Sequence, residues 1–307
     1  MPFASDVVAS HIPTERFIAV KKFVATLALV PLAFGLAACG SSDSASGDSE
    51  TVKIGIVGRD PVNDKLKEVA EKDGIDIEYQ EFTDYSQPNP ALKSGDIDMN
   101  WFQHIAYLSD YNVNADDNLN IVGPTVIYPM ALFSKKHDSL DQIPQGGEIA
   151  IPNDTVNEAR ALQLLEANKL VTFKSDTDRP TIDDVDTDKS KVKVTAVDAT
   201  QTVVSMESVD GSVINNDFLK DAGLNPKDAL AQDDPSNDYA KPYVNLFVSQ
   251  DEDKDNETYK KVVELFHSSE VQEVVQEETA GTAVEVKTDV SELRSTLADA
   301  EESLRKQ

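Results

Sequence analysis

Three acidic residues at alternating positions, Asp251, Asp253 and Asp255, have the spacing with which calcium-binding loops begin. Such a loop places a glycine at its sixth position and a glutamate at its twelfth, where this chain has Asn256 and Val262. A second alternating set fails the same test, and it consists of Asp96, Asp98 and Asn100. We therefore expect no metal site at either place.

Residues with which enzymes carry out catalysis are present but are not combined in a known pattern. The chain has no nucleophile elbow, no glycine-rich phosphate-binding loop and no Walker motif. The four histidines are far apart in the sequence and lack the spacing of zinc ligands; they are His11, His104, His137 and His267. We therefore predict that the protein is not an enzyme and holds no cofactor.

The only cysteine of the 307 residues is Cys39, and it directly follows a Leu-Ala-Ala sequence. This sequence ends an apolar run that begins at Phe23 after two lysines, as in a secretory signal. The run is shorter than the about 20 residues that span a bilayer. We predict that residues 1–38 are a signal peptide and that Cys39, in a lipobox-like setting, becomes the lipidated first residue. The alternative is an ordinary signal peptide with an unmodified thiol.

Two further segments flank this signal. Residues 1–19 are mixed in polarity and make a poor start for a signal peptide, so we predict that translation begins at Val20 and that these residues are an extension. Residues 39–50 consist, after the cysteine, of small and polar residues, and we predict a flexible tether. The lipid and the tether together would anchor an extracytoplasmic protein to the cell membrane.

The composition restricts the partners of the folded part. The chain has 56 Asp and Glu against 28 Lys and Arg, which gives a net charge of −28. This charge argues against binding to nucleic acid or to anionic lipid, both of which attract basic surfaces. A single cysteine leaves no intrachain disulfide, so the 40% hydrophobic content must stabilise the fold by packing. We expect a monomer.

Alternating and amphipathic patterns predict two α/β units in series. A strand over 51–57, a helix over 65–72 and a strand over 75–79 form a βαβ pattern, which indicates a mainly parallel sheet. We interpret 84–91 as a loop because it contains two prolines. In the second unit, a strand over 148–151 precedes a helix that Asp154 caps and that ends near Asn168.

The chain ends with a strand over 243–248 and two amphipathic helices over 257–276 and 290–305. We expect these last elements to return to the first unit. The resulting lobes comprise residues 51–130 plus 246–307 and residues 131–245, with a hinge and a ligand cleft between them.

Several polar and aromatic motifs occur in a fixed order through the folded part. They are Asp84-Tyr85 with Pro88-Asn89, Phe102-Gln103-His104 with Tyr107, Tyr128-Pro129, Asn153-Asp154 with Asn157 and Arg160, Val213-Ile214-Asn215-Asn216, and Tyr243-Val244-Asn245. Their order and spacing resemble the methionine-binding lipoproteins of bacterial ABC importers, the MetQ/NlpA family, over about residues 51–280.

This resemblance implies an α/β, two-lobed periplasmic-binding-protein-like fold. It also implies that the protein captures L-methionine outside the membrane and delivers it to a permease with a cytoplasmic ATPase.

The resemblance also implies the ligand-binding residues. Arg160 would bind the amino-acid carboxylate, because guanidinium is always charged and can form two parallel hydrogen bonds. Asn157, one helical turn earlier, would share the carboxylate, and Asn215 would bind the polar end of the ligand. The thioether would lie among aromatic rings, which attract sulfur; these positions are Tyr85, Phe102, His104, Tyr107 and Tyr128.

The chain departs from the family pattern at Trp101, at Thr155-Val156 and at Glu158-Ala159. These departures leave the side-chain preference of the site undetermined. D-Methionine, a methionine derivative and a methionine dipeptide are therefore alternative ligands. A surface lipoprotein or adhesin without a transport role and a lipidated hydrolase are further alternatives.

Overall fold

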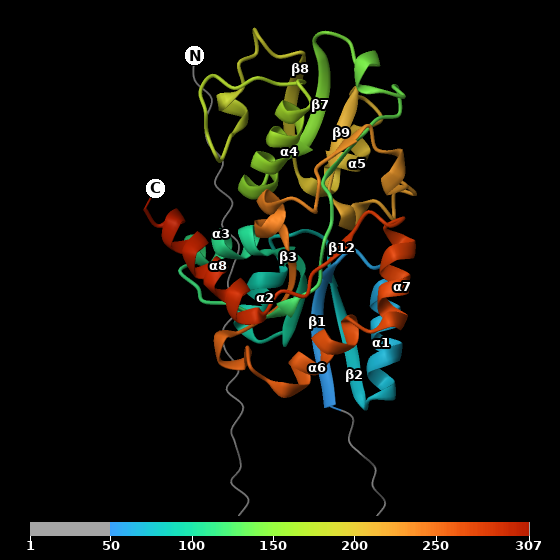
Figure 1. Cartoon of the computed structure of the whole chain (residues 1–307), viewed down its shortest axis with the longest axis vertical. Coiled ribbons are helices and arrows are strands. Elements are labelled where there is room, and N and C mark those ends of the chain that lie inside the picture. Colours follow the sequence, from blue (N-terminus) through green and yellow to red (C-terminus); the bar gives the residue numbers. More distant parts are fainter. Residues whose placement is uncertain (1–49, 307) are drawn as a thin grey trace, which may run out of the picture. The chain divides into compact units, whose positions relative to one another are not determined.

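The computed structural model describes residues 50–306, and two five-stranded sheets organise this part of the chain. The first sheet has the strand order β2-β1-β3-β11-β4 and is the centre of what we call the first lobe. Its strands are β1 (Glu50–Val57), β2 (Ile75–Phe82), β3 (Met99–His104), β4 (Asn120–Pro124) and β11 (Asn245–Ser249). They occupy the lower half of the view in Figure 1.

The second sheet has the order β10-β6-β9-β7-β8 and is the centre of the second lobe, in the upper half of Figure 1. Its strands are β6 (Ala131–Phe133), β7 (Gly147–Pro152), β8 (Val192–Val197), β9 (Gly211–Ile214) and β10 (Ala231–Gln232). A two-stranded sheet joins β5 (Val126–Ile127) to β12 (Val284–Glu285).

The prediction of a mainly parallel sheet is confirmed for the first lobe, where four of the five strands run in one direction and β11 runs against them. β1 is parallel to β2 and β3, but β11 is antiparallel to β3 and β4. Likewise β7 is parallel to β8 and β9, whereas β6 is antiparallel to β9 and β10. The reason is topological, because β11 enters the first sheet from the second lobe and so runs against its neighbours.

Helices cover both sheets. In the first lobe α1 packs against α6 and α7, and α3 packs against α8. The helices are α1 (Pro61–Lys72), α2 (Pro88–Ser94), α3 (Ile105–Ala115), α4 (Thr155–Ala167), α5 (Thr202–Ser205), α6 (Glu257–Phe266), α7 (Ser269–Glu278) and α8 (Val290–Leu304). Short 3-10 turns occur at Leu140–Gln142, Ile182–Asp184, Ala199–Gln201, Asn216–Phe218, Pro226–Asp228, Asp238–Tyr243 and Asp251–Asp253. No helix within residues 50–306 is long and apolar enough to cross a membrane.

Two helix predictions need correction. The segment 84–91 is not a loop throughout, since α2 begins at Pro88. A proline in the first turn of a helix loses no hydrogen bond, because the first backbone N–H groups have no partner in the helix. The predicted helix over 257–276 is two helices, and the chain breaks at His267 and Ser268. There the imidazole of His267 contacts Glu285 and the carbonyl of Pro124, which ties the break to the first lobe.

The chain passes between the two sheets twice. Residues 125–130 lead from β4 to β6, and residues 233–244 lead from β10 back to β11. We call these segments the first and the second connection. Each sheet has its own buried core: Trp101 packs against Phe247 and Phe266 in the first lobe, and Leu162 and Leu165 of α4 are fully buried in the second.

Candidate functional site

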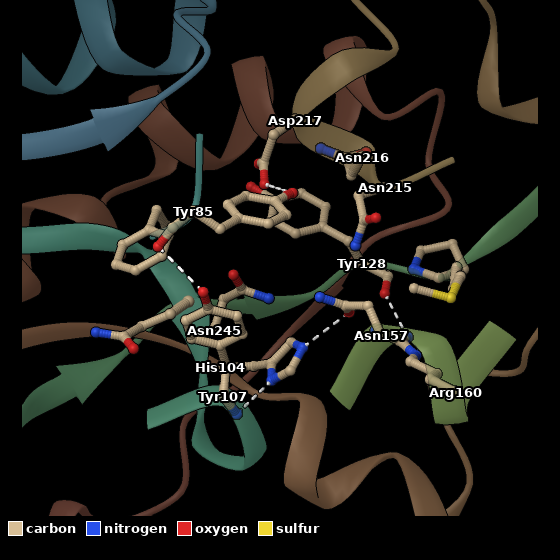
Figure 2. Close-up of a pocket in the computed structure, with 14 residues that line it drawn as sticks. Tyr85, His104, Tyr107, Tyr128, Asn157, Arg160, Asn215, Asn216, Asp217 and Asn245 are labelled. Carbon is tan, nitrogen blue, oxygen red and sulfur yellow. Dashed lines mark hydrogen bonds between the residues drawn. The ribbon is translucent and has the colours of Figure 1, made fainter. Parts of the chain in front are cut away.

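A cavity lies between the lobes and is lined from both of them and from the first connection. Figure 2 shows 14 residues around it, and all eight residues predicted as ligand contacts are among them. The predicted ones are Tyr85, Phe102, His104, Tyr107, Tyr128, Asn157, Arg160 and Asn215. Six further residues line the cavity. Gln103, Pro129, Asn216 and Asn245 lie within the motifs identified in the sequence, and Met130 and Asp217 directly follow such a motif.

Aromatic rings of the first lobe form one wall. The ring centroid of Tyr85 lies 5.9 Å from that of Phe102 and 6.1 Å from that of Tyr107. The hydroxyl of Tyr107 donates to the backbone carbonyl of Tyr85 at 3.1 Å, which fixes the two residues relative to each other. Behind them Gln103 forms hydrogen bonds with Asn89 and Asn100 in a buried amide cluster. The wall is therefore held in place by its own supporting contacts.

His104 caps α3 and reaches across to the second lobe. Its Nδ1 accepts the backbone N–H of Tyr107 at 3.1 Å, so the ring proton lies on Nε2. Nε2 faces Oδ1 of Asn157 at 3.4 Å and donates to it. Burial, together with the nearby charge of Arg160, lowers the pKa of His104 to about 3, so the ring is neutral at pH 7.

Asn157 stands on the first turn of α4, where Asp154 is the N-cap. The Asp154 carboxylate accepts the backbone N–H of Asn157 at 3.0 Å and its side-chain Nδ2 at 3.0 and 3.1 Å. Burial raises the pKa of Asp154, and the hydrogen bonds from Asn157 oppose that rise. The amide of Asn157 thus links the helix cap to His104, and the predicted cap at Asp154 is confirmed.

Arg160 follows one turn later on α4 and is buried. Its Nε and Nη2 donate to the two carboxylate oxygens of Asp233 at 2.7 and 3.2 Å. Nη2 also donates to the carbonyl of Tyr128 at 2.9 Å, as the dashed line in Figure 2 shows. The guanidinium carbon lies 4.1 Å from the ring centroid of Tyr243. Of the three guanidinium nitrogens of Arg160, only Nη1 has no hydrogen-bond partner among residues 50–306.

Asn215 follows the end of β9 and brings an unused acceptor to the cavity. Its Oδ1 is buried and has no hydrogen-bond partner among the residues that the structure describes. A buried amide oxygen without a partner costs about 1–3 kcal/mol, so a donor from a ligand would relieve this cost. Asn216 and Asn245 line the same cavity and add further amide groups.

Asp217 closes the cavity from the second lobe. Its Oδ2 accepts the hydroxyl proton of Tyr85 at 2.6 Å, a contact between the lobes. Burial raises the pKa of Asp217 to about 7, the hydrogen bond from Tyr85 opposes that rise, and the charge of Asp60 adds to it. No sequence signal singled out this residue, because a lone aspartate in a turn is ordinary.

The departures from the family pattern do not face the cavity. Trp101 is buried between Phe247 and Phe266 in the core of the first lobe. Glu158 accepts the backbone N–H of Ile182 with a carboxylate oxygen at 3.0 Å, away from the cavity. The predicted lipidation site, Cys39, and the predicted signal and tether segments lie outside the described residues.

The chain is similar to known proteins over most of its length. A profile of the NlpA lipoprotein family matches residues 52–287. The chain is 35% identical to the "D-methionine-binding lipoprotein MetQ" of Escherichia coli strain K12, over 88% of this chain and 97% of that protein.

Two solved structures are similar in fold. A nutrient binding protein from Burkholderia cenocepacia bound to methionine is 36% identical, with a TM-score of 0.72 over 77% of this chain and 100% of that one. The substrate binding protein of a methionine transporter from Streptococcus pneumoniae is 35% identical, with a TM-score of 0.71 over 77% of this chain and 96% of that one. The predicted two-lobed α/β fold class is thereby confirmed.

Proposed function

Because this chain belongs to the NlpA lipoprotein family, we propose that it is the substrate-binding lipoprotein of an ABC importer. We propose that it captures methionine outside the membrane and delivers it to a permease with a cytoplasmic ATPase. In this role the protein is a binding protein and not an enzyme.

The observation that carries the proposal is that two residues lining one cavity each have an unused polar group. Nη1 of Arg160 can donate to a ligand carboxylate, and Oδ1 of Asn215 can accept from a ligand ammonium. An α-amino acid has both groups on adjacent atoms. Charge-assisted hydrogen bonds of this kind are the strong ones, and buried groups gain most from them.

The other half of the ligand meets the aromatic wall. Tyr85, Phe102 and Tyr107 surround an apolar part of the cavity, and Tyr128 and the neutral His104 complete its lining. A thioether sulfur near an aromatic ring gains about 0.3–1.5 kcal/mol per contact. The wall therefore suits the unbranched, polarisable side chain of methionine.

We further propose that the ligand closes the lobes around itself. The aromatic wall belongs to the lobe of residues 51–130 plus 246–307, whereas Asn157, Arg160 and Asn215 belong to residues 131–245. A ligand that contacts both favours the closed state by its differential affinity. The two connections would act as the hinge.

The anchor of this protein is part of the proposal. Cys39 would be lipidated and the following residues of 39–50 would form a tether, so that a monomeric body stays close to its permease. Mass spectrometry of the mature protein tests this directly. An N-terminal diacylglyceryl mass on Cys39 is expected, and an unmodified thiol would contradict it.

Calorimetric titration tests the ligand. The chain from Gly40 onward is unfolded and refolded to remove any ligand acquired during expression, and is then titrated with L-methionine and D-methionine. We expect micromolar or tighter binding of L-methionine. Absence of binding by a folded protein would overturn the proposed ligand, and tighter binding of D-methionine would reassign its chirality.

Replacing Arg160 by alanine tests the polar end of the site. We expect the binding free energy to fall by about 2–5 kcal/mol, because a buried charge pair across the binding interface loses one partner. This corresponds to about 30-fold or more in Kd. Calorimetry measures the affinity, and circular dichroism verifies that the variant is folded.

The matched control is Arg294→Ala. Arg294 also donates to backbone carbonyls, those of Ile121 and Lys254, but it lies in the first lobe away from the cavity lining. Its replacement should leave the affinity for methionine unchanged. A loss of less than about tenfold in folded Arg160→Ala would contradict the assigned role.

A further inference from the structure

Every partner of Arg160 outside its own helix belongs to one of the two connections. Tyr128 lies on the first connection, and Asp233 and Tyr243 lie on the second. Asp233 also accepts the backbone N–H of Met130 with Oδ1 at 2.8 Å. Asp233 therefore joins both connections to the guanidinium group at one point.

The ion pair is well buried. The side chain of Arg160 is 6% exposed and that of Asp233 is 10% exposed. Charges at this depth are screened much less than surface charges. The carboxylate uses both oxygens on Arg160, so the guanidinium is held through Nε and Nη2 and cannot rotate freely.

This arrangement changes what Arg160 offers to a ligand. A free guanidinium would present a cation with two parallel donors to a ligand, but here Nε and Nη2 already donate to Asp233. Only Nη1 remains, and the positive charge is already balanced by a carboxylate at hydrogen-bond distance. His104 in the same lining is neutral, so it adds no positive charge.

We propose that Asp233 is a positioning residue that holds Arg160 with Nη1 free for the ligand and balances its charge, so that the site selects head groups with no net charge. The inference rests on the proposed function and deepens it. A zwitterion brings its own balancing ammonium, whereas an anion leaves a buried negative charge uncompensated. A cation lacks the acceptor that Nη1 requires.

The test uses the variant Asp233→Asn and three ligands of similar shape. L-Methionine is the zwitterion, 4-(methylsulfanyl)butanoate lacks the ammonium group, and 3-(methylsulfanyl)propan-1-amine lacks the carboxylate. Neither analogue is larger than methionine, so a poor fit cannot explain its rejection. Asparagine keeps an acceptor for Met130 and nearly the same volume, which favours a folded variant.

Competitive calorimetry gives the affinity of each analogue relative to L-methionine. In the wild type both analogues should bind at least about 100-fold more weakly than L-methionine, a difference of about 2.7 kcal/mol. In Asp233→Asn the relative affinity of the butanoate should rise at least tenfold, and that of the amine should not rise. Asp233→Glu, which keeps the charge, should retain the wild-type order.

Asp234→Asn is the matched control, since it removes the same charge one residue away. Asp234 is exposed and contacts Ser236 and Asn237 rather than Arg160. Its replacement should leave all three affinities and their ratios unchanged.

The outcomes separate the two proposals. If the wild type binds L-methionine and the ratios are the same in Asp233→Asn, the inference about Asp233 is overturned alone. An equal loss for all three ligands in a folded variant would mean a purely structural role, and this also overturns it. If the folded wild type binds no methionine, both the proposed function and this inference fall.

Discussion

At Asp217 a carboxylate is buried against a hydroxyl instead of a cation. Tyr85 donates to it at 2.6 Å, and no ion-pair partner of Asp217 occurs within residues 50–306. Burial raises its pKa to about 7, and the charge of Asp60 contributes in the same direction. Lys220, which lines a neighbouring surface pocket with Asp217, is paired with Glu278. Asp217 is therefore partly protonated near neutral pH.

The pH dependence of this residue has a definite sign. Its pKa in the folded state, about 7, exceeds the ordinary value of 3.8, so the folded protein binds the proton more tightly. This contribution to stability is full below about pH 4 and is lost as the pH rises towards 7. We expect Asp217→Asn, which stays neutral and can still accept from Tyr85, to be more stable than the wild type at pH 8.

The expected gain is at least about 1 kcal/mol at pH 8, or about 2–4 °C in Tm, and it should vanish at pH 4. Thermal unfolding at both pH values measures it. Asp221→Asn, at an exposed position of the same lobe, should show no such difference. Equal stability of Asp217→Asn and the wild type at pH 8 would contradict the assigned environment.

The sequence predicted individual residues well where they lie in a motif, and poorly elsewhere. The eight predicted positions line one cavity because each belongs to a run with a fixed order. Asp233 lies in an acidic segment that has the composition of an exposed turn, and only the fold brings it to Arg160. The amide of Asn157 is likewise present in the lining, but its contact with His104 depends on how the lobes meet.

Among the elements, α4 positions two polar residues of the cavity lining, Asn157 and Arg160. It begins at Thr155 because Asp154 accepts the N–H of Asn157, a local interaction that the sequence alone predicts. The break between α6 and α7 is different, because His267 is held by Glu285 from a distant segment. Local signals thus predicted the start of α4, whereas a tertiary contact fixed the break.

Removing the cap of α4 should affect both stability and binding. Asp154→Ala loses the capping acceptor and both side-chain bonds to Asn157, so we expect a cost of about 1–2 kcal/mol in the free energy of unfolding. Affinity for methionine should also fall, since Asn157 and Arg160 both stand on this helix. Asp154→Ser keeps a capping oxygen and should recover most of the stability.

The control for this prediction is the cap of α8. Asp289 accepts the N–H of Ser291 at 2.8 Å, and α8 contributes nothing to the cavity lining. Asp289→Ala should cost a similar amount of stability in urea unfolding while calorimetry shows an unchanged affinity. If Asp154→Ala lowers stability and leaves affinity intact, α4 does not position the polar groups as argued.

For the whole molecule, the order of the strands in each sheet could not be predicted from the sequence patterns. The patterns predicted two α/β units and a return of the chain, but strand direction depends on which edge the returning strand joins. β11 returns between β3 and β4 and runs antiparallel to both of them. Side-chain contacts then join the lobes at separate places; they are Tyr85–Asp217, His104–Asn157, Asp110–Arg179 and Lys220–Glu278.

The pair of Arg179 and Asp110 offers a test of whether such contacts hold the closed state. Nη2 of Arg179 lies 2.8 Å from Oδ1 of Asp110, with 31% and 21% of the two side chains exposed. A partly exposed pair of this kind contributes about 0.2–1 kcal/mol, which corresponds to a few-fold change in a rate. Because the pair joins the lobes and neither residue lines the cavity, its loss should favour opening without changing the site itself.

We therefore expect Arg179→Glu to raise the dissociation rate of methionine about two- to fivefold, and the double variant Arg179→Glu with Asp110→Arg to restore it. The increase should shrink at 1 M salt, where charges are screened beyond about 3 Å. Stopped-flow displacement measures the rate. The control is Arg305→Glu, which breaks a pair between the C-cap of α8 and Glu301 in the same helix. This pair does not join the lobes, so its loss should leave the rate unchanged. An increase that the double variant fails to reverse would mean that Arg179 acts through the local fold of its segment and not through the contact between the lobes.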